Sequence, residues 1–558
     1  MNYAMKKSLQ SLGLAAAFSM LGTAAFAADT TGIVKWPYLI YTGQNTQMEV
    51  LWQDVDTETT NTLSWGTDTT YSMGSVPVAE NSAATGMHQH IYTITGLTPN
   101  TTYYYQVSGV AANSVSSTGV FTGSFITGPD ASATHVKFLA LGDTRTNPFA
   151  LDNVMQAMTK VYQNIDPEYQ RLAIHAGDWV DSDTEAYWTS KWFDPTKTDI
   201  VTFTANTPIN GVKGNHEDNG GYSQYFPKYF PFPFMNTTPQ SAGSLSFNNY
   251  YGSFDYGPVH FTLADQYSTY TPGSPQYVWL VNDLMSTTKP WKILMFHEPG
   301  WNAGTHTNNT TAQAVFDNLI KLYNVDLVYM GHSHNYARCQ VNNSAMANGD
   351  SIVPNVPYVT SGAGGAPLDA IDKSNTGSWR HVVTAESVYQ YETFNIQGKT
   401  LTMNVYKIPN ASTTAIVATT SAPIETMVIN HFTDVSSQIG VTSTGFGWSR
   451  VSKQSTGSLT ITNNGPDLTG TIDVALSGIA ALQNGSIPGI ADLTAISPNT
   501  TGLITNVTLV NATGQNNGAP MIQAATTGLA NNTSITIPLS FSNPANVKIN
   551  FTPVIVQE

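Results

Sequence analysis

Four short apolar segments of this chain each run directly into an aspartate or a histidine. They are residues 136–141 before Asp143, residues 172–176 before Asp178, residues 292–296 before His297 and residues 327–330 before His332. Helical spacing follows the first of them, over residues 151–162, so the pattern predicts alternating strands and helices, which is typical of βαβ units. Because functional side chains collect at the carboxyl ends of the strands in such sheets, the pattern predicts a polar crevice built from distant parts of the chain.

Five segments carry the polar side chains that would line this crevice. They are Gly142-Asp143-Thr144-Arg145, Gly177-Asp178-Trp179-Val180-Asp181, Gly214-Asn215-His216-Glu217, Phe296-His297-Glu298-Pro299 and Gly331-His332-Ser333-His334. Carboxylate, amide and imidazole donors together suit zinc, iron or manganese better than copper or a thiolate cluster. Taken alone, a Gly-Asp pair is often only a turn, and a lone histidine is often structural. The gaps of 35, 37, 82 and 35 residues between the ligand positions 143, 178, 215, 297 and 332 fit successive units of one sheet.

Short strands are predicted on both sides of this central region. Residues 48–52 alternate apolar and polar side chains, and Leu97 and Tyr103 lie where a β-sandwich buries its corner. The region 432–558 is rich in Thr, Asn and Gly and predicts a second sandwich. The predicted divisions are a signal peptide at 1–27, a β-sandwich at 33–127, an α/β domain at 135–428 and a β-sandwich at 432–558.

The N-terminus predicts export. Lys6 and Lys7 precede the apolar run 12–21, and Ala25-Phe26-Ala27 follows, which together are typical of a secretory signal cleaved after Ala27. The alternative is a membrane anchor, but the run is shorter than the roughly 20 residues that a span needs. We therefore expect a periplasmic or extracellular protein with no transmembrane segment.

Composition excludes several other classes of protein. The formal charge is −15, from 22 Lys and Arg against 37 Asp and Glu, so no nucleic acid partner is expected. The single cysteine, Cys339, excludes an internal disulfide framework and a cysteine-based zinc finger.

The five segments, in this order, resemble the calcineurin-like metallophosphoesterase superfamily. With the preceding sandwich, which resembles a fibronectin type III-like domain, residues 33–410 are similar to the purple acid phosphatase-like branch. Residues 276–284, 336–338 and 358–365 add to this likeness. The resemblance implies a multidomain fold with an N-terminal β-sandwich and a central α/β metallophosphoesterase domain. The central domain would consist of two packed sheets flanked by helices. The C-terminal β-sandwich is similar to immunoglobulin-like modules of secreted bacterial proteins.

The resemblance also implies a role for each polar residue. It implies two divalent or trivalent ions of Fe, Zn or Mn, with Asp178 bridging them. Asp143 and His334 would bind the first ion, and Asn215, His297 and His332 the second. His216 would face the phosphate or the leaving group, and His306 would contact the substrate, the alternative being a solvated loop histidine.

Two departures from the family pattern concern the first ion. Arg145 stands where many members have the histidine of Asp-x-His, and Asp181 stands where purple acid phosphatases have a tyrosine. The first ion therefore lacks its usual third protein ligand, so that Asp181 or water fills the position or the ion is weakly held. Arg145 is expected either to clamp a phosphate oxygen in a bidentate manner or to form a salt bridge with a nearby carboxylate.

The resulting hypothesis is an exported hydrolase of phosphate monoesters that uses a metal-bridging hydroxide to attack phosphorus. His216 would protonate the leaving group. The alternatives are a phosphodiesterase or nucleotidase of the same fold and a catalytically lapsed surface or matrix-binding protein. Besides a small phosphorylated substrate, the C-terminal module is expected to bind the cell envelope or a polymer.

Overall fold

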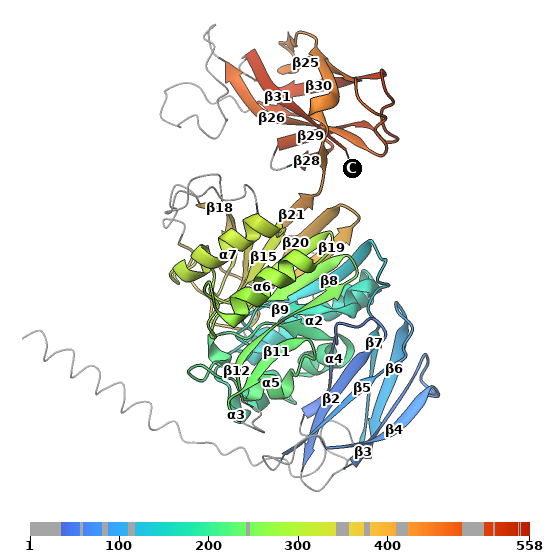
Figure 1. The fold of residues 1–558 in the computed structure, drawn as a ribbon, viewed down its shortest axis with the longest axis vertical. Helices are drawn as coiled ribbons and strands as arrows, with labels where there is room; N and C mark the ends of the chain where they lie inside the picture. Colours follow the sequence, from blue (N-terminus) through green and yellow to red (C-terminus); the bar gives the residue numbers. More distant parts are fainter. Residues whose placement is uncertain are drawn as a thin grey trace, which may run out of the picture.

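The computed structural model describes most of the chain as three successive β-rich parts (Figure 1). The described residues are 35–55, 60–80, 87–109, 118–241, 246–341, 356–372, 380–408, 422–482, 507–516, 519–544, 546 and 548–557. The predicted signal peptide at 1–27 lies outside the described residues. Among the residues described, no helix is both long and apolar enough to span a bilayer.

Two antiparallel sheets pack face to face in the N-terminal part, in the strand orders β1-β2-β5 and β4-β3-β6-β7. The strands are β1 (Lys35–Ile40), β2 (Met48–Val55), β3 (Thr60–Gly66), β4 (Gly74–Ala79), β5 (Met87–Ile94), β6 (Thr102–Ser108) and β7 (Val120–Ile126). Trp36, Trp52 and Phe125 are buried between the sheets. The Tyr103 hydroxyl accepts the backbone N–H of Thr98 at 3.0 Å, which fixes the corner that leads into β6.

The central part contains two sheets, of which the first has the order β10-β9-β8-β19-β20-β21. Its strands are β8 (His135–Leu141), β9 (Ala173–His175), β10 (Ile209–Gly211), β19 (Tyr389–Gln397), β20 (Thr400–Ile408) and β21 (Glu425–Asn430). Strands β8, β9 and β10 are parallel, so their carboxyl ends meet at one edge. The segments that contain Asp143, Asp178 and Asn215 follow these three strands.

The second central sheet has the order β11-β12-β13-β14-β15-β17-β16-β18. Its strands are β11 (Met235–Pro239), β12 (Phe247–Tyr256), β13 (Val259–Leu263), β14 (Trp291–Met295), β15 (Leu327–Met330), β16 (Tyr336–Val341), β17 (Pro357–Ser361) and β18 (Arg380–Glu386). Strands β13, β14, β15 and β17 are parallel. His297 follows β14 and His332 follows β15.

The two central sheets pack against each other through an aromatic core. The Phe138 ring lies 4.6 Å from the ring of Phe394 in its own sheet and 5.4 Å from the ring of Phe261 in the other sheet, between centroids. The expectation that the residue gaps mark successive units of one sheet is therefore wrong, because the ligand segments come from both sheets. A gap of 35 residues reflects the length of a crossover, which is similar in either sheet.

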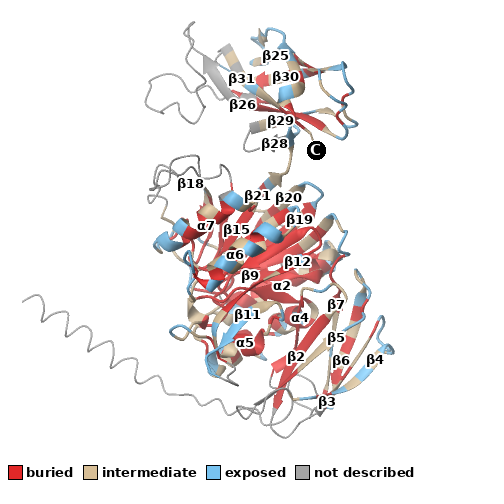
Figure 2. Cartoon of the chain, viewed as in Figure 1, coloured by how far each residue is buried: buried red, intermediate tan, exposed pale blue. Residues whose placement is uncertain are grey.

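Helices α2 (Pro148–Asn164), α6 (Pro275–Ser286) and α7 (Thr310–Tyr323) cover the outer faces of this sandwich (Figure 1). The other helices of the central part are α3 (Glu185–Tyr187), α4 (Thr198–Asn206), which contacts α2 and β1, and α5 (Tyr225–Tyr229). Four of these helices begin after a polar cap whose side chain accepts a backbone N–H group: Asn147 for α2, Thr184 for α3, Ser274 for α6 and Asn309 for α7. Figure 2 shows exposed outer faces on α6 and α7 above buried strands, as amphipathic helices on a sheet require.

The C-terminal part follows β21 and consists of two sheets of five strands each. The first has the order β22-β31-β26-β29-β28. The second has the order β23-β25-β30-β27, with β24 paired to β25. Its strands are β22 (Thr433–Asp434), β23 (Ile439–Ser443), β24 (Gly447–Ser449), β25 (Gln454–Asn463), β26 (Ile472–Leu482), β27 (Thr508–Leu509), β28 (Gly514–Asn516), β29 (Ala519–Ala525), β30 (Ser534–Ser542) and β31 (Lys548–Gln557). Leu459, Val474 and Phe541 are buried in its core.

Candidate metal centre

The loops that carry the predicted ligands leave their strands through unusual backbone conformations. Asp143, Asp178 and His332 have φ angles of 51°, 57° and 68°, in the left-handed region that residues other than glycine rarely adopt. The Asp143 N–H donates to the Gly177 carbonyl at 2.9 Å, which ties the first two loops together. Strain of this kind persists where the surrounding structure enforces it, and it clusters at functional sites.

Two glycines allow the ligand carboxylates to approach the loops closely. A Cβ atom on Gly214 would lie 2.1 Å from Asp178 Oδ1, and one on Gly331 would lie 2.2 Å from Asp143 Oδ2. Any larger residue at either position would displace a carboxylate. The glycines in the third and fifth sequence segments are therefore required by the site itself.

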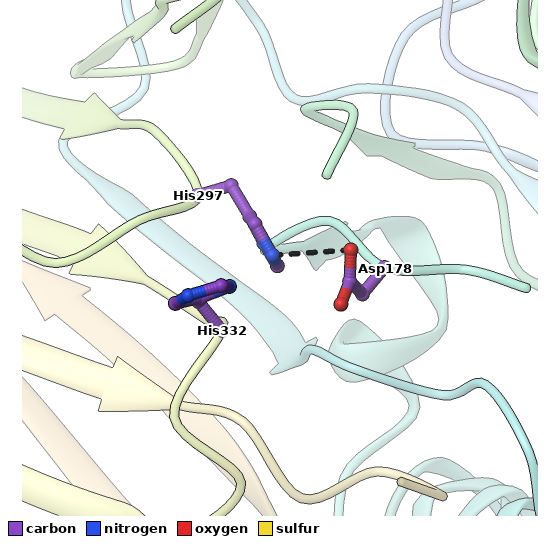
Figure 3. Close-up of side chains that lie close together, drawn as sticks. All are labelled: Asp178, His297 and His332. Carbon is purple, nitrogen blue, oxygen red and sulfur yellow. Dashed lines mark ion pairs between the residues drawn. The ribbon is translucent and has the colours of Figure 1, made fainter. Parts of the chain in front are cut away.

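The residues predicted for the second ion converge on one point. His297 Nε2 lies 3.1 Å from Asp178 Oδ1 and 3.2 Å from Asn215 Oδ1, and His332 Nδ1 lies 3.0 Å from the same amide oxygen. Figure 3 shows His297, His332 and Asp178 turned toward one another from three different loops. The His297 Nδ1–H donates to the Ala176 carbonyl at 2.8 Å, which leaves Nε2 facing the cluster.

Burial and charge set the protonation of these groups. Burial opposes a charge on His297, but the adjacent Asp178 carboxylate outweighs it and raises the pKa of His297 to about 10. Burial also opposes the charge of Asp178, but His297, His216 and Arg145 hold its pKa well below the usual range. Burial and the positive charge of His297 lower the pKa of His332 to about 3, so its ring is neutral. A neutral imidazole beside a carboxylate is the state that binds a cation.

The residues predicted for the first ion also lie together. One ligand atom each from Asp143, Asp178 and His334 lies within 4.8 Å of the others, and all three residues are buried. The Asp143 carboxylate accepts the His332 N–H at 2.9 and 3.0 Å, and burial raises the Asp143 pKa well above its usual value. The His334 Nδ1–H donates to the Pro367 carbonyl at 2.8 Å, so its Nε2 faces the site.

The Arg145 side chain occupies the space among these three residues. Its Nε donates to Asp178 Oδ2 at 3.2 Å, and one terminal nitrogen lies 3.0 Å from His334 Nε2. Of the two expectations for this residue, the structure therefore contains the salt bridge to a nearby carboxylate. After burial, the positive charge of Arg145 is the main cause that lowers the pKa of His334, to about 4.

Asp181 lies beside the first position but makes other contacts. Its carboxylate accepts the N–H and the hydroxyl of Thr146, and it lies 3.7 Å from Arg145 and 3.8 Å from Lys191 Nζ. These partners already satisfy both of its oxygens. The possibility that Asp181 supplies a third ligand would require it to give up the Thr146 contacts.

His216 and His306 flank the cluster with more exposed rings. The His216 Nδ1–H donates to the Asp181 carbonyl at 2.6 Å, and its Nε2 lies 3.7 Å from Asp178 Oδ2. The side chain of His216 is 26% exposed and that of His306 is 37% exposed. The His306 ring centroid lies 4.4 Å from that of His332. His216, beside Asp178, and His306, beside His332, are therefore both within reach of a group bound at the centre.

Glu217 ends the third sequence segment, and the sequence alone indicates no role for it. Its buried carboxylate accepts four backbone N–H groups at 2.8 to 3.0 Å, from Asp178, Trp179, Val180 and Gly214. Burial and the charge of Asp178 raise the pKa of Glu217 to about 8, against the effect of these donors. Glu217 thus holds the turn that presents Asp178 and the turn that precedes the next ligand.

Asp369 was not singled out in the sequence, and no local motif marks it. It accepts the His334 N–H at 2.9 Å, and its Oδ2 lies 3.3 Å from His306 Nε2. His306, His334 and Asp369 also form a cluster with potential ligand atoms within 4.8 Å of one another. Asp369 therefore orients both histidines, one of them a predicted ligand.

The donor set fits a cation fully at the second position only. There, the Asp178 carboxylate, the Asn215 oxygen and the rings of His297 and His332 offer two oxygen and two nitrogen donors, a mixture that suits zinc, iron or manganese. At the first position, the donors surround a guanidinium that is already hydrogen-bonded to two of them. A cation fits there only if Arg145 moves away.

Known proteins share the sequence of the first two parts. A family profile described as calcineurin-like phosphoesterase matches residues 136–336, and one described as purple acid phosphatase, N-terminal domain, matches residues 36–123. Purple acid phosphatase 15 of Arabidopsis thaliana is 25% identical over 269 residues, which are 45% of this chain and 49% of that protein. Phosphoenolpyruvate phosphatase of Allium cepa is 26% identical over 202 residues, which are 34% of this chain and 41% of that protein. The chain spans about half the length of these relatives or less.

Solved structures share the fold. A purple acid phosphatase from yellow lupin (Lupinus luteus) seeds matches with a TM-score of 0.53 and 17% identity, over 72% of this chain and 75% of its own. A structure named PhoD matches with a TM-score of 0.54 and 13% identity, over 72% of this chain and 91% of its own. The chain therefore carries a calcineurin-like phosphoesterase domain preceded by a purple acid phosphatase N-terminal domain, as the order of its motifs predicted.

Proposed function

We propose that this protein is an exported, metal-dependent hydrolase of phosphate monoesters. The observation that carries the proposal is the convergence of Asp178, Asn215, His297 and His332 from both central sheets onto one point. The match to calcineurin-like phosphoesterases over this same region supports the reaction class.

Those four residues would hold the cation, and Asp178 would also face the first position. Fe, Zn and Mn are the candidates for this donor set. When bound, such a cation lowers the pKa of a nearby water toward neutrality and neutralises phosphate charge.

His216 acts in the proposed reaction as the general acid. Because its Nδ1–H is engaged by the Asp181 carbonyl, the ring is held with Nε2 toward the centre. In the protonated ring this Nε2–H donates to the oxygen of the departing alkoxide. Asn215, which directly precedes His216, is a predicted ligand, so one loop positions both the ligand and the proton donor.

His306 supplies a second contact to the substrate. It lies at the rim of the centre, and Asp369 fixes its orientation at 3.3 Å. An imidazole N–H in this place donates to a phosphate oxygen and positions the ester for in-line attack, and positioning contributes much of the catalysis of phosphoryl transfer.

The choice of monoesters rests on a relative. The Allium cepa protein is named for phosphoenolpyruvate, which is a phosphate monoester. The signal-like N-terminus with Lys6, Lys7 and the 12–21 run supports export. The C-terminal part carries none of the five ligand segments and is proposed to bind an envelope component or a polymer.

A chromogenic monoester and its bis-ester, 4-nitrophenyl phosphate and bis(4-nitrophenyl) phosphate, test the function. The protein loaded with zinc, manganese or iron is expected to turn over the monoester, and D178A is expected to lose this activity and the bound metal. D130A is the matched control and should retain both, because Asp130 is exposed and precedes β8, at the opposite end of that strand from Asp143. Preferred turnover of the bis-ester would favour a phosphodiesterase. Loss of neither activity nor metal in D178A would refute the site, and no turnover by the loaded wild type would refute the enzyme proposal in favour of a non-catalytic binding protein.

A further inference from the structure

The Arg145 guanidinium lies where the ligands of the first ion converge. It hydrogen-bonds Asp178 Oδ2 at 3.2 Å and His334 Nε2 at 3.0 Å, and it lies 3.7 Å from Asp181 Oδ1. Metal ions bind carboxylate oxygen and imidazole nitrogen at about 2.0–2.2 Å. A cation at that distance from both Asp178 Oδ2 and His334 Nε2 would overlap the guanidinium.

Arg145 also uses the lone pairs that such a cation would need. The His334 Nδ1–H is committed to the Pro367 carbonyl at 2.8 Å, so Nε2 is the acceptor of this ring, and an Arg145 N–H is directed at it. Asp178 Oδ2 accepts the Arg145 Nε–H, while Asp178 Oδ1 faces His297 on the side of the second position. The two oxygens of Asp178 therefore face two different positive groups.

The loop holds Arg145 in this place through its backbone. The N–H groups of Thr144 and Arg145 both donate to the Asp178 carbonyl, at 2.9 and 3.3 Å. The Arg145 side chain is only 16% exposed. The guanidinium carries a positive charge, so a second cation beside it would be repelled.

We propose that Arg145 replaces the first metal ion, so that the chain binds one cation, at the second position, and uses a tethered guanidinium as the other positive charge. This inference rests on the proposed metal-dependent function, because it assigns the charges of the same site. Guanidinium N–H groups match phosphate oxygens, so the Arg145 N–H groups not engaged by Asp178, Thr146 and His334 would neutralise and orient a phosphate held beside the bound cation.

The test is the number of ions bound per chain. The wild-type protein, R145Q and R145H are each stripped with a chelator and titrated with Zn²⁺ by calorimetry and elemental analysis. R145Q removes the charge, and R145H removes the charge and adds an imidazole ligand. R171H is the matched control, because Arg171 is also a mostly buried arginine paired to a carboxylate, Glu168 at 3.1 Å, but it precedes β9 and so lies at the opposite end of that strand.

The expected result is one tightly bound ion in the wild type and in R171H, and two in R145H. R145Q should bind a second ion at least about 100-fold more tightly than the wild type does, because the repulsion from the guanidinium is gone. Electron paramagnetic resonance of the Mn²⁺-loaded proteins supplies an independent readout. The wild type should give the hyperfine spectrum of an isolated ion, and R145H the spectrum of an exchange-coupled pair.

Three results would overturn the inference. Two tightly bound ions in the wild type would overturn it and leave the proposed function standing. This measurement needs no variant. A single ion in both R145Q and R145H, with the proteins folded, would show that Arg145 does not exclude the second cation. No bound ion in the wild type would overturn the proposed function as well.

Discussion

Replacing Glu217 with glutamine tests how the fold presents Asp178. The Glu217 carboxylate is fully buried and accepts the N–H groups of Trp179 and Val180 on one oxygen. Its other oxygen accepts those of Asp178 and Gly214. Glutamine has nearly the same shape but keeps only one oxygen, so two of these N–H groups would face an amide NH₂ instead of an acceptor.

The structure sets the size of the expected effect. A buried donor left without its acceptor costs about 1–3 kcal/mol, so E217Q should lower the free energy of unfolding by about 2–6 kcal/mol. Because the turn at Asp178 loosens, metal affinity should also fall by about 10–100-fold, as for other residues that support ligands from behind.

Urea denaturation followed by tryptophan fluorescence measures the first effect, and calorimetric titration with Zn²⁺ measures the second. The control is E386Q, the same chemical change at a half-exposed glutamate whose only described ion pair is with Lys407 at 3.7 Å. Its effect on stability should be about 0–1 kcal/mol. If E217Q is as stable as E386Q and binds zinc as tightly as the wild type, the assignment of Glu217 as the support of the Asp178 turn is wrong.

Three further outcomes are expected. H216A should retain its metal but lower kcat by about 10²–10⁴-fold, more for esters with poor leaving groups, and loss of metal in elemental analysis would contradict its role as acid. Burial opposes protonation of His260, but hydrogen bonds to Asp255 and Asp283 outweigh it and raise its pKa to about 9. The ion pairs of protonated His260 with Asp255 and Asp283 therefore stabilise the fold fully below pH 6.5. This contribution, about 3 kcal/mol, is lost as pH rises through 9. H260Q should flatten that part of the pH profile of stability, and an unchanged profile would rule out the ion pairs as its cause. D369N should lower kcat/KM about tenfold, through both a higher KM and a lower kcat, because His306 loses its orientation, and an unchanged kcat/KM would show that Asp369 does not orient His306.

The sequence alone predicted the polar ends of the strands and the residues that converge there. This was possible because the signals are local: an apolar strand and the aspartate or histidine after it, which in three of the four cases follows a glycine, occupy fewer than ten consecutive positions. The close approach of Asp143 and Asp178 to Gly331 and Gly214 explains why glycine recurs in these segments.

The function of Glu217 and Asp369 could not be predicted in the same way. Glu217 acts on backbone N–H groups 37 to 39 residues before it, and Asp369 acts on His334, 35 residues before it. Every residue except proline has the same backbone N–H donor, so no sequence motif identifies the residue whose N–H takes part in such a contact.

By itself, the sequence determined which residues stand at the strand ends and the chemistry of their donor atoms, since both depend on neighbours in the chain. The tertiary structure alone decided that these residues come from two facing sheets, and that Arg145 points into the first ion position instead of outward. The physical reason is that the direction of a long side chain depends on which opposite charges and hydrogen-bond acceptors surround it. Asp178 and His334, which receive the guanidinium, are 33 and 189 residues away in the chain. The pairing of β8 with β9 brings Asp178 beside Arg145, whereas His334, which follows β15 in the other sheet, meets it only when the two sheets pack together.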